Sequence, residues 1–208
     1  MSLKPSRYPS RASEDMEVIY SVLDAGLFCT IAFNRDGIPH QIPTGYCRIG
    51  DKMYIHGSSK SHFMDAIIGQ QVSFSVTHLD ALVLAPTAFD HSFNYRSVIG
   101  FAEGKEVSDE QRKLEFFKTF TDRYIPGRIA DVGEPTSDQI RITKLVELSL
   151  DRAAVKMREG DAGIKDLNGF DKWVGVIPLE YSYGTPEIDP QIADRVEQPD
   201  YLKEFVRK

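Results

Sequence analysis

Residues 27–38 read Leu27-Phe-Cys-Thr-Ile-Ala-Phe-Asn-Arg-Asp-Gly-Ile38, and this stretch predicts a β-hairpin. Its first part is mainly apolar and forms a compact strand, while the Asp-Gly pair has the chemistry of a hairpin turn. The chain returns as a second strand over residues 38–49, which contains Pro39 and Pro43. Because proline lacks an N–H group, we expect an edge, a bulge or a backbone that faces something other than a neighbouring strand there.

The sequence on either side of this hairpin predicts more strands than long helices. Further strands are expected over residues 52–56, 72–78, 81–88, 95–107, 144–150, 153–157 and 174–179. A tight turn is expected at Leu79-Asp80, and helices from Ser13 to Gly26, over residues 62–68, and from Ser108 to Tyr124. Several strands joined by tight turns favour a mainly β fold with peripheral helices, an antiparallel barrel, over layers of alternating strands and helices.

The chain divides into a main domain and two ends. Its 208 residues are enough to bury a hydrophobic core without disulfides or metals. Residues 1–12 are polar and predict an N-terminal arm, and residues 13–183 form the predicted domain. Residues 184–208 are Pro-rich and charged, so we expect a loosely attached C-terminal tail.

The composition excludes several classes of function. The formal net charge is −6, so the chain lacks the basic surface of a general nucleic-acid binder or of a protein that binds anionic membranes. No apolar stretch approaches the roughly 20 residues of a membrane span, and the N-terminus lacks the apolar run of a signal peptide. Cys29 and Cys47 form neither a disulfide framework nor a metal-ligand spacing, so we expect reduced, packed thiols in a cytoplasmic protein.

The segment that says most about function reads His56-Gly57-Ser58-Ser59-Lys60-Ser61 and lies between a predicted strand and a short predicted helix. Its hydroxyls, backbone N–H groups and single ammonium group suit a phosphate, and Gly57 lets the backbone approach a ligand closely. The alternative is an N-capped helix with a solvated lysine, and the pattern alone favours that alternative.

Two further segments contain candidate ligand-binding groups. Asn94-Tyr95-Arg96-Ser97 enters a strand after a polar turn, and an arginine there can bind a carbonyl, carboxylate or phosphate through two hydrogen bonds. A pairing of Arg96 with a surface carboxylate is an equally open alternative. At Ile42-Pro43-Thr44 the proline leaves backbone groups that could hold a planar heterocycle, with a simple bulge as the alternative.

Other catalytic and metal motifs are absent from the sequence. The five histidines, at positions 40, 56, 62, 78 and 91, lack the spacing of a zinc site. There is no nucleophile elbow, Walker loop or glycine-rich dinucleotide fingerprint. We therefore predict no metal site, and no catalytic residue is assigned.

Seven motifs, in consistent order over roughly residues 7–181, carry a resemblance to a known family. They are Leu23-Asp-Ala-Gly-Leu27, Ile42-Pro-Thr44, Tyr54-Ile-His-Gly-Ser-Ser-Lys60, Ala81-Leu-Val-Leu-Ala85, Asn94-Tyr-Arg-Ser-Val98, Tyr124-Ile-Pro-Gly-Arg128 and Trp173-Val-Gly-Val-Ile-Pro178. The chain resembles the FMN-binding split-barrel flavoproteins, the pyridoxamine 5′-phosphate oxidase-like superfamily, and within it the nitroimidazole-resistance branch.

This resemblance implies a six-stranded antiparallel split barrel that forms a homodimer, with FMN at the subunit interface. By position, the FMN phosphate would lie on residues 58–61, with Gly57 in the same turn. The flavin ring would lie beside residues 43–44, and His56 near the ribityl chain or the ring. Residues 94–97 would line the pocket, and Trp173 would pack near the partner's flavin.

The same resemblance implies an FMN-dependent oxidoreductase that acts on a small nitroaromatic or quinone-like compound through flavin N5. NADH or NADPH is a candidate electron donor. A non-catalytic flavin carrier or sensor is an alternative, and so is a barrel that binds haem through His56 or His91. The family's vitamin B6 oxidases carry arginines that are missing from the corresponding residues 39–48 and 173–180, so vitamin B6 oxidation is not expected.

Overall fold

The Asp36-Gly37 pair builds the hairpin that the sequence predicts. In the computed structural model, which describes residues 8–207, strands β2 (Phe28–Arg35) and β3 (Ile38–Ile49) pair antiparallel along their length. Asp36 and Gly37 both have positive φ angles, 54° and 80°, as a two-residue turn that follows the twist of its strands requires.

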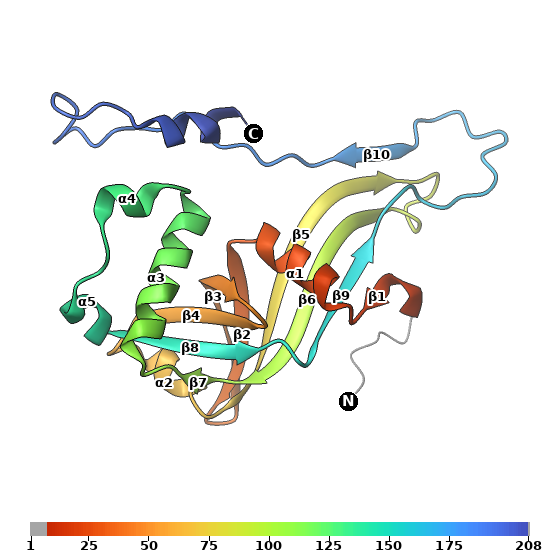
Figure 1. Ribbon diagram of the computed structural model, residues 1–208. Coiled ribbons are helices and arrows are strands. Elements are labelled where there is room, and N and C mark those ends of the chain that lie inside the picture. The colour runs from red at the N-terminus through yellow and green to blue at the C-terminus, as the bar shows by residue number, and fades with distance from the viewer. Residues whose placement is uncertain (1–7, 208) are drawn as a thin grey trace.

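The strands form one antiparallel sheet that curls into a half-barrel with few helices (Figure 1). Among the described residues the sheet has ten strands in the order β1-β9-β6-β5-β2-β3-β4-β8-β7, and β10 pairs with β5. The other strands are β1 (Ala12–Ser13), β4 (Lys52–Ser58), β5 (Gln71–Leu84), β6 (Ser92–Glu103), β7 (Lys105–Glu106), β8 (Thr143–Ser149), β9 (Ala153–Arg158) and β10 (Gly175–Pro178). The helices are η1 (Pro9–Arg11), α1 (Met16–Ala25), α2 (His62–Ile67), α3 (Glu110–Tyr124), α4 (Arg128–Val132), α5 (Ser137–Arg141) and η2 (Asp200–Arg207), with η marking a 3₁₀ helix. The predicted mainly β, antiparallel split barrel is confirmed.

Strand β5 differs from the sequence prediction. We expected a turn at Leu79-Asp80 to separate two strands, but β5 is a single strand of 14 residues and Leu79-Asp80 is a β-bulge within it. Strand β6 pairs with β5 on both sides of the bulge, from Gln71 to Val83. The predicted turn is therefore wrong, because the polar pair bends the strand without ending it.

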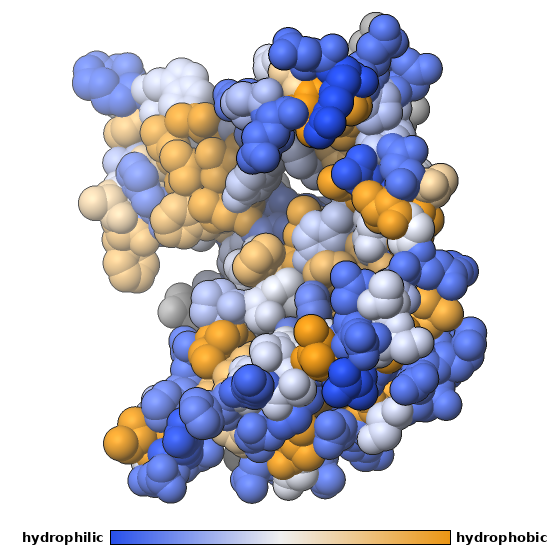
Figure 2. Space-filling view, turned by 90° about the vertical axis from the view of Figure 1, so that its left-hand side faces the viewer, coloured by the Kyte–Doolittle hydropathy of each residue, from blue (hydrophilic) through white to orange (hydrophobic). Residues whose placement is uncertain are grey.

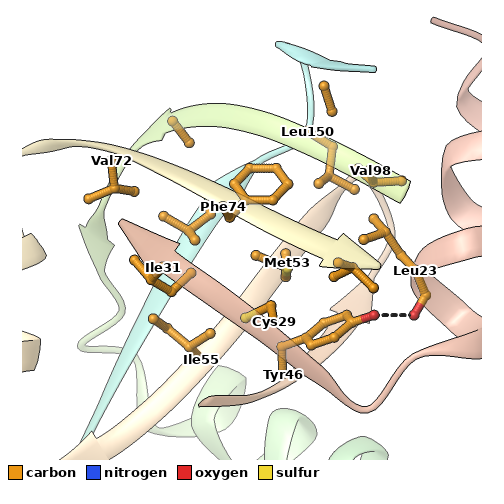
Figure 3. Close-up of a cluster of buried hydrophobic side chains, with 14 of the residues drawn as sticks. Leu23, Cys29, Ile31, Tyr46, Met53, Ile55, Val72, Phe74, Val98 and Leu150 are labelled. Atoms are coloured by element: carbon orange, nitrogen blue, oxygen red, sulfur yellow. Dashed lines mark hydrogen bonds between the residues drawn. The ribbon is translucent and has the colours of Figure 1, made fainter. Parts of the chain in front are cut away.

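The larger hydrophobic cluster fills the interior of the barrel (Figure 3). Ile31 and Phe74, from neighbouring strands, are almost completely buried in it. Tyr46 is also fully buried, and its hydroxyl donates a 2.5 Å hydrogen bond to the Leu23 carbonyl near the end of α1. This bond satisfies the polar end of a core tyrosine and fixes α1 against the barrel.

A second, smaller cluster lies on the outer face of the sheet. Because side chains alternate along a strand, the neighbours of the interior residues on β3 and β4 point outward. Cys47 and Tyr54 point this way and pack, with Leu145 of β8, against Phe116 of α3. Helix α3 therefore covers the outer face where β3, β4 and β8 meet.

The barrel is split between β3 and β4. These strands pair only over Tyr46–Ile49 and Lys52–Ile55, while the end of β4 pairs with β8 as far as Ser58 and Thr143. The first part of β3 has β2 as its only strand neighbour within residues 8–207. Pro39 and Pro43 lie in this one-sided part, which confirms the expectation from their missing N–H groups.

The predicted N-terminal arm falls partly outside the residues that the structure describes. Its residues 1–7 lie outside the described residues, and Ala12, at its end, already pairs with Lys156 of β9. No helix within residues 8–207 is both long enough and apolar enough to cross a membrane.

The C-terminal tail leaves β10 and runs past α3 and α4 to η2 (Figure 1). It is held by Tyr201, whose hydroxyl accepts a 2.9 Å hydrogen bond from Arg128 and donates a 2.5 Å hydrogen bond to Asp131. The tail therefore contacts α4 through specific hydrogen bonds with Arg128 and Asp131.

Candidate functional site

The turn of residues 58–61 caps helix α2, which is the alternative that the sequence pattern favoured. Ser61 caps α2, because its side chain accepts a hydrogen bond from the Met64 backbone at 3.4 Å. The turn also uses its own backbone: the Ser61 N–H donates to the Ser58 carbonyl at 2.9 Å, and the Ser59 N–H to the Ile142 carbonyl at 2.7 Å. Backbone amides that are already paired contribute little to an anion, so side chains must supply most of the attraction.

Cationic side chains gather around this turn. Lys60 is exposed and makes no ion pair within residues 8–207. Lys144 of β8 lies opposite Gly57 in the β4–β8 ladder, and its ammonium group forms an ion pair with Asp65 of α2. Because the Asp65 carboxylate balances the charge of Lys144, Lys60 is the one of these two lysines whose charge has no ion-pair partner within the described residues.

Lys113 of α3 adds a buried cation beside the same turn. Its Nζ donates a 2.8 Å hydrogen bond to the carbonyl of Thr143, the residue paired with Ser58. Neither Lys113 nor Lys144 was singled out in the sequence, because both are distant in the chain from the serine-rich turn. Only the pairing of β4 with β8 and the packing of α3 bring them to it.

His56 is the most unusual side chain near the turn. It lies on the outer face of β4, with its ring centroid 5.3 Å from that of Phe116, 5.9 Å from Phe117 and 4.8 Å from Phe120. Its buried Nδ1 atom has no hydrogen-bond partner among the described residues. Burial lowers the pKa of His56 below the usual 6.5, so the ring is neutral at pH 7.

The one-sided part of β3 lies on the other side of the split. If the β3–β4 ladder continued beyond Tyr46 and Ile55, Thr44 would lie opposite Gly57, but the pairing stops before that point. Gly45 lets α3 approach β3 closely, since a Cβ atom there would lie 2.6 Å from the Tyr124 hydroxyl oxygen. Residues 43–44 and the turn thus flank the split beneath α3.

Residues 94–97 lie far from the turn within one chain. The end of β6 that lies near α2 is at Glu103, which pairs with Gln71 of β5. Arg96 lies seven residues before Glu103, which is about 23 Å along β6 at the usual rise of a strand. Arg96 binds both carboxylate oxygens of Asp80, at 3.0 Å through Nε and 2.8 Å through Nη2. The carboxylate pairing of Arg96 that the sequence left open is therefore present.

The neighbours of Arg96 are also engaged in the fold. The Asn94 side chain is buried, donates to the Gly160 carbonyl at 2.9 Å and accepts from Arg158 at 2.5 Å. The Ser97 hydroxyl donates to the Lys156 carbonyl at 3.2 Å. In one chain, these groups hold β6, β9 and the following loop together.

Trp173 precedes β10 and is 63% exposed. Nearby, Phe93 and Ile177 are exposed and lie on either side of Leu82 in the β6-β5-β10 ladder, so the three form an apolar row on one face.

On the side of the molecule seen in Figure 2, hydrophobic surface gathers at the upper left above a notch, while the lower half is mostly polar.

The two cysteines confirm the expectation of packed thiols. Cys29 and Cys47 are buried and unbonded to one another, and burial raises the pKa of Cys29 to about 12. No group of three or more potential metal-ligating side chains of His, Cys, Asp or Glu occurs within the described part of the chain.

The fold and the sequence together identify the family. A family model described as pyridoxamine 5′-phosphate oxidase matches residues 15–157, which is more than half of the chain, so the protein belongs to this family. This confirms the resemblance seen in the sequence. No curated protein matches the chain.

Two solved structures are similar over nearly the whole chain. The flavocytochrome Anf3 from Azotobacter vinelandii is 32% identical, with a TM-score of 0.89, and the match covers 97% of this chain and 94% of that one. An FAD- and haem-binding protein from Mycobacterium smegmatis is also 32% identical, with a TM-score of 0.88 and coverage of 94% and 97%.

A 5-nitroimidazole antibiotic resistance protein from Bacteroides thetaiotaomicron is a more distant neighbour. It is 16% identical, with a TM-score of 0.56, and the match covers 70% of this chain and 85% of that one. At this identity the likeness shows the shared fold alone.

Proposed function

We propose that the protein is a redox protein that binds a flavin and a haem. The observation that carries this proposal is the neutral His56 ring, whose buried nitrogen lacks a partner among the described residues and which lies beside the turn of residues 58–61. The two relatives at 32% identity are described as a flavocytochrome and as an FAD- and haem-binding protein.

The flavin phosphate is proposed to bind at residues 58–61, with Lys60, Lys113 and Lys144 as the cations around this turn. The flavin ring then lies against the one-sided part of β3 at Pro43 and Thr44, where the sequence resemblance placed it. FMN has both the phosphate and the flavin ring that these two parts of the site would bind. A bound flavin supplies hydride or one-electron chemistry at N5.

A homodimer would complete the flavin pocket. Along β6, Arg96 lies about 23 Å and Asn94 about 30 Å from Glu103 at the α2 end of the sheet, so they reach a flavin at the turn only from a second chain. The apolar row of Phe93, Leu82 and Ile177, with exposed Trp173 near it, offers such a chain a dry surface. Arg96 would then favour a reduced, anionic flavin.

The surroundings of His56 fit a haem better than those of His91. A histidine that holds a haem iron must be a neutral imidazole with a free ring nitrogen, and an apolar setting suits the haem ring. His56 meets this requirement with its three phenylalanine neighbours, whereas His91 is exposed to solvent. A haem held by His56 supplies one-electron transfer, and its neighbours would exclude water from the ring faces.

Titration of the purified protein with haemin tests the haem assignment. We expect a Soret band that saturates at one haem per chain in the wild type and in His91→Ala, and a lost or strongly weakened band in His56→Ala. Haem binding that is the same in His56→Ala would contradict the assignment, and flavin binding would then be tested alone.

The reaction itself is proposed as reduction or oxidation of a small nitroaromatic or quinone-like compound through flavin N5. Stopped-flow reduction of the flavin-loaded protein by NADH or NADPH tests it. Fast reduction followed by reoxidation with a quinone supports an oxidoreductase, whereas slow reduction without turnover supports a carrier or sensor.

A further inference from the structure

A pocket of about 510 Å³ lies where the C-terminal tail passes the end of β2. Its lining comes from three parts of the chain: residues 25–28 between α1 and β2, residues 77–78 of β5, and residues 181–183 of the tail, which follow β10 (Figure 1). The volume is in the range of sites that bind small ligands, about 300–1,000 Å³. Neither the turn of residues 58–61 nor His56 lines this pocket.

The pocket occupies a gap along one edge of β5. Strands β2 and β10 share this edge, since β2 pairs with residues 73–75 and β10 with residues 81–84. Between them, residues 76–79 have β6, on the opposite edge, as their only strand neighbour within residues 8–207. The edge between β2 and β10 is therefore open to a ligand.

The gap lies beside the proposed position of the flavin ring. Phe28, at the start of β2, pairs with Gly45, so Pro43 is its diagonal neighbour across the two strands, about 7–8 Å away. Phe28 points to the outer face of the sheet, because the next residue, Cys29, points into the core. A ligand that contacts Phe28 therefore adjoins the part of β3 where the flavin ring is proposed to lie.

Aromatic side chains form the walls of the pocket. Phe28, Tyr181 and Tyr183 line it, and all three are exposed to solvent. The Tyr183 ring is held by an edge-on contact with Phe205 of η2, with 5.0 Å between the ring centroids. Exposed apolar rings around a pocket indicate a binding site, and flat rings suit a flat aromatic ligand.

His78 provides one oriented polar group in this aromatic setting. Its Nε2 lies 3.0 Å from the Val22 carbonyl oxygen, which can only accept, so Nε2 carries the proton. The ring packs on Gly26, where a Cβ atom would lie 3.2 Å from its Cε1. Nδ1 has no hydrogen-bond partner within residues 8–207, and in the neutral ring it accepts a hydrogen bond.

We infer that this pocket binds a planar aromatic compound with a hydroxyl group, and that the hydroxyl donates a hydrogen bond to Nδ1 of His78. The inference rests on the proposed function, because the hydroxyl form of a quinone-like compound is a hydroquinone and the pocket adjoins the proposed flavin ring. It narrows the substrate class to phenols and hydroquinones and assigns the residues that hold them.

The test compares two probes of the same size, 2-naphthol and 2-methylnaphthalene, of which only the first has a hydroxyl. Their dissociation constants are measured by equilibrium dialysis at pH 8, with and without FMN. His78→Gln is chosen because its amide can replace Nε2 as the donor to Val22 and leaves the position of Nδ1 empty. Tyr181→Ala removes a wall side chain that is 79% exposed, and Phe89→Ala, at an aromatic residue that is 89% exposed and outside the pocket, is its matched control.

We expect the wild type to bind both probes. His78→Gln should weaken 2-naphthol by about fivefold and change 2-methylnaphthalene by less than about twofold. Tyr181→Ala should weaken both probes by about threefold or more, because both lose the same aromatic contact, and Phe89→Ala should change neither.

The outcomes separate this inference from the proposed function. If the wild type does not bind 2-naphthol, or if His78→Gln and Tyr181→Ala bind it unchanged, the pocket assignment is wrong and the flavin and haem sites are unaffected. If Tyr181→Ala weakens self-association and leaves 2-naphthol binding unchanged, a second copy of the chain covers these rings and the inference is also wrong. The expected pattern in a protein that binds no flavin would support the pocket and overturn the proposed function.

Discussion

Replacing Lys144 with alanine should weaken flavin binding more than replacing Lys60, although Lys60 is the lysine within the turn sequence. The turn's Ser59 and Ser61 amides already have partners, so cationic side chains carry the attraction for a phosphate. The Lys144 side chain is only 18% exposed, and a charge-assisted contact there contributes about 1.5–3 kcal/mol, or roughly tenfold to a hundredfold in Kd. Lys60 is exposed, and an exposed contact contributes about 0.2–1 kcal/mol, at most about fivefold.

The assay is a titration of each purified variant with FMN, followed by flavin fluorescence. Lys105→Ala, at an exposed lysine of β7, is the control for a general loss of positive charge. Because Lys144→Ala leaves the Asp65 carboxylate unpaired, the double variant with Asp65→Asn separates the lost cation from the exposed anion. Weak binding that Asp65→Asn fully restores, or a larger effect from Lys60→Ala, would refute the reasoning.

Four further predictions follow from individual side chains. Burial lowers the pKa of His56 below 6.5, so as the pH falls the unfolded chain takes up a proton on this ring at a higher pH than the folded chain does. The free energy of unfolding, measured in urea, should therefore fall more for the wild type than for His56→Gln between pH 7 and pH 5. With a pKa of about 12, the Cys29 thiol should react with a disulfide reagent only after unfolding, and labelling of the native protein would contradict this. Arg123 donates to the Leu23 carbonyl at 2.6 Å, so Arg123→Met should lower the free energy of unfolding by about 2–4 kcal/mol in a urea titration. Trp173→Ala should reduce self-association in sedimentation equilibrium without a change in far-UV circular dichroism, and an unaltered dimer would argue against the interface.

The parts of the fold that the sequence predicts depend on local chemistry. The Asp36-Gly37 turn needs two positive φ angles, and these residue types adopt them readily, so the hairpin could be placed from the sequence. Leu79-Asp80 shows the limit of this reasoning. A polar residue after an apolar strand looks like a turn, but the pairing of β6 with both halves of β5 keeps the chain extended there.

The candidate site could be predicted only in part for a similar reason. The Ser-rich turn and His56 are adjacent in sequence and were found together. Lys113 and Lys144 come to the turn through strand pairing and helix packing, which no local pattern records. Asp80 reaches Arg96 across the β5–β6 ladder, at the bulge, and the sequence could name the type of partner without identifying it.

The visible absorption spectrum of the protein after incubation with both a flavin and haemin, and removal of the unbound cofactors, tests the central proposal most directly. The proposal predicts one spectrum that contains both the flavin bands and a Soret band, each at about one cofactor per chain. A protein that stays colourless, or that retains a flavin and never a haem, would contradict it.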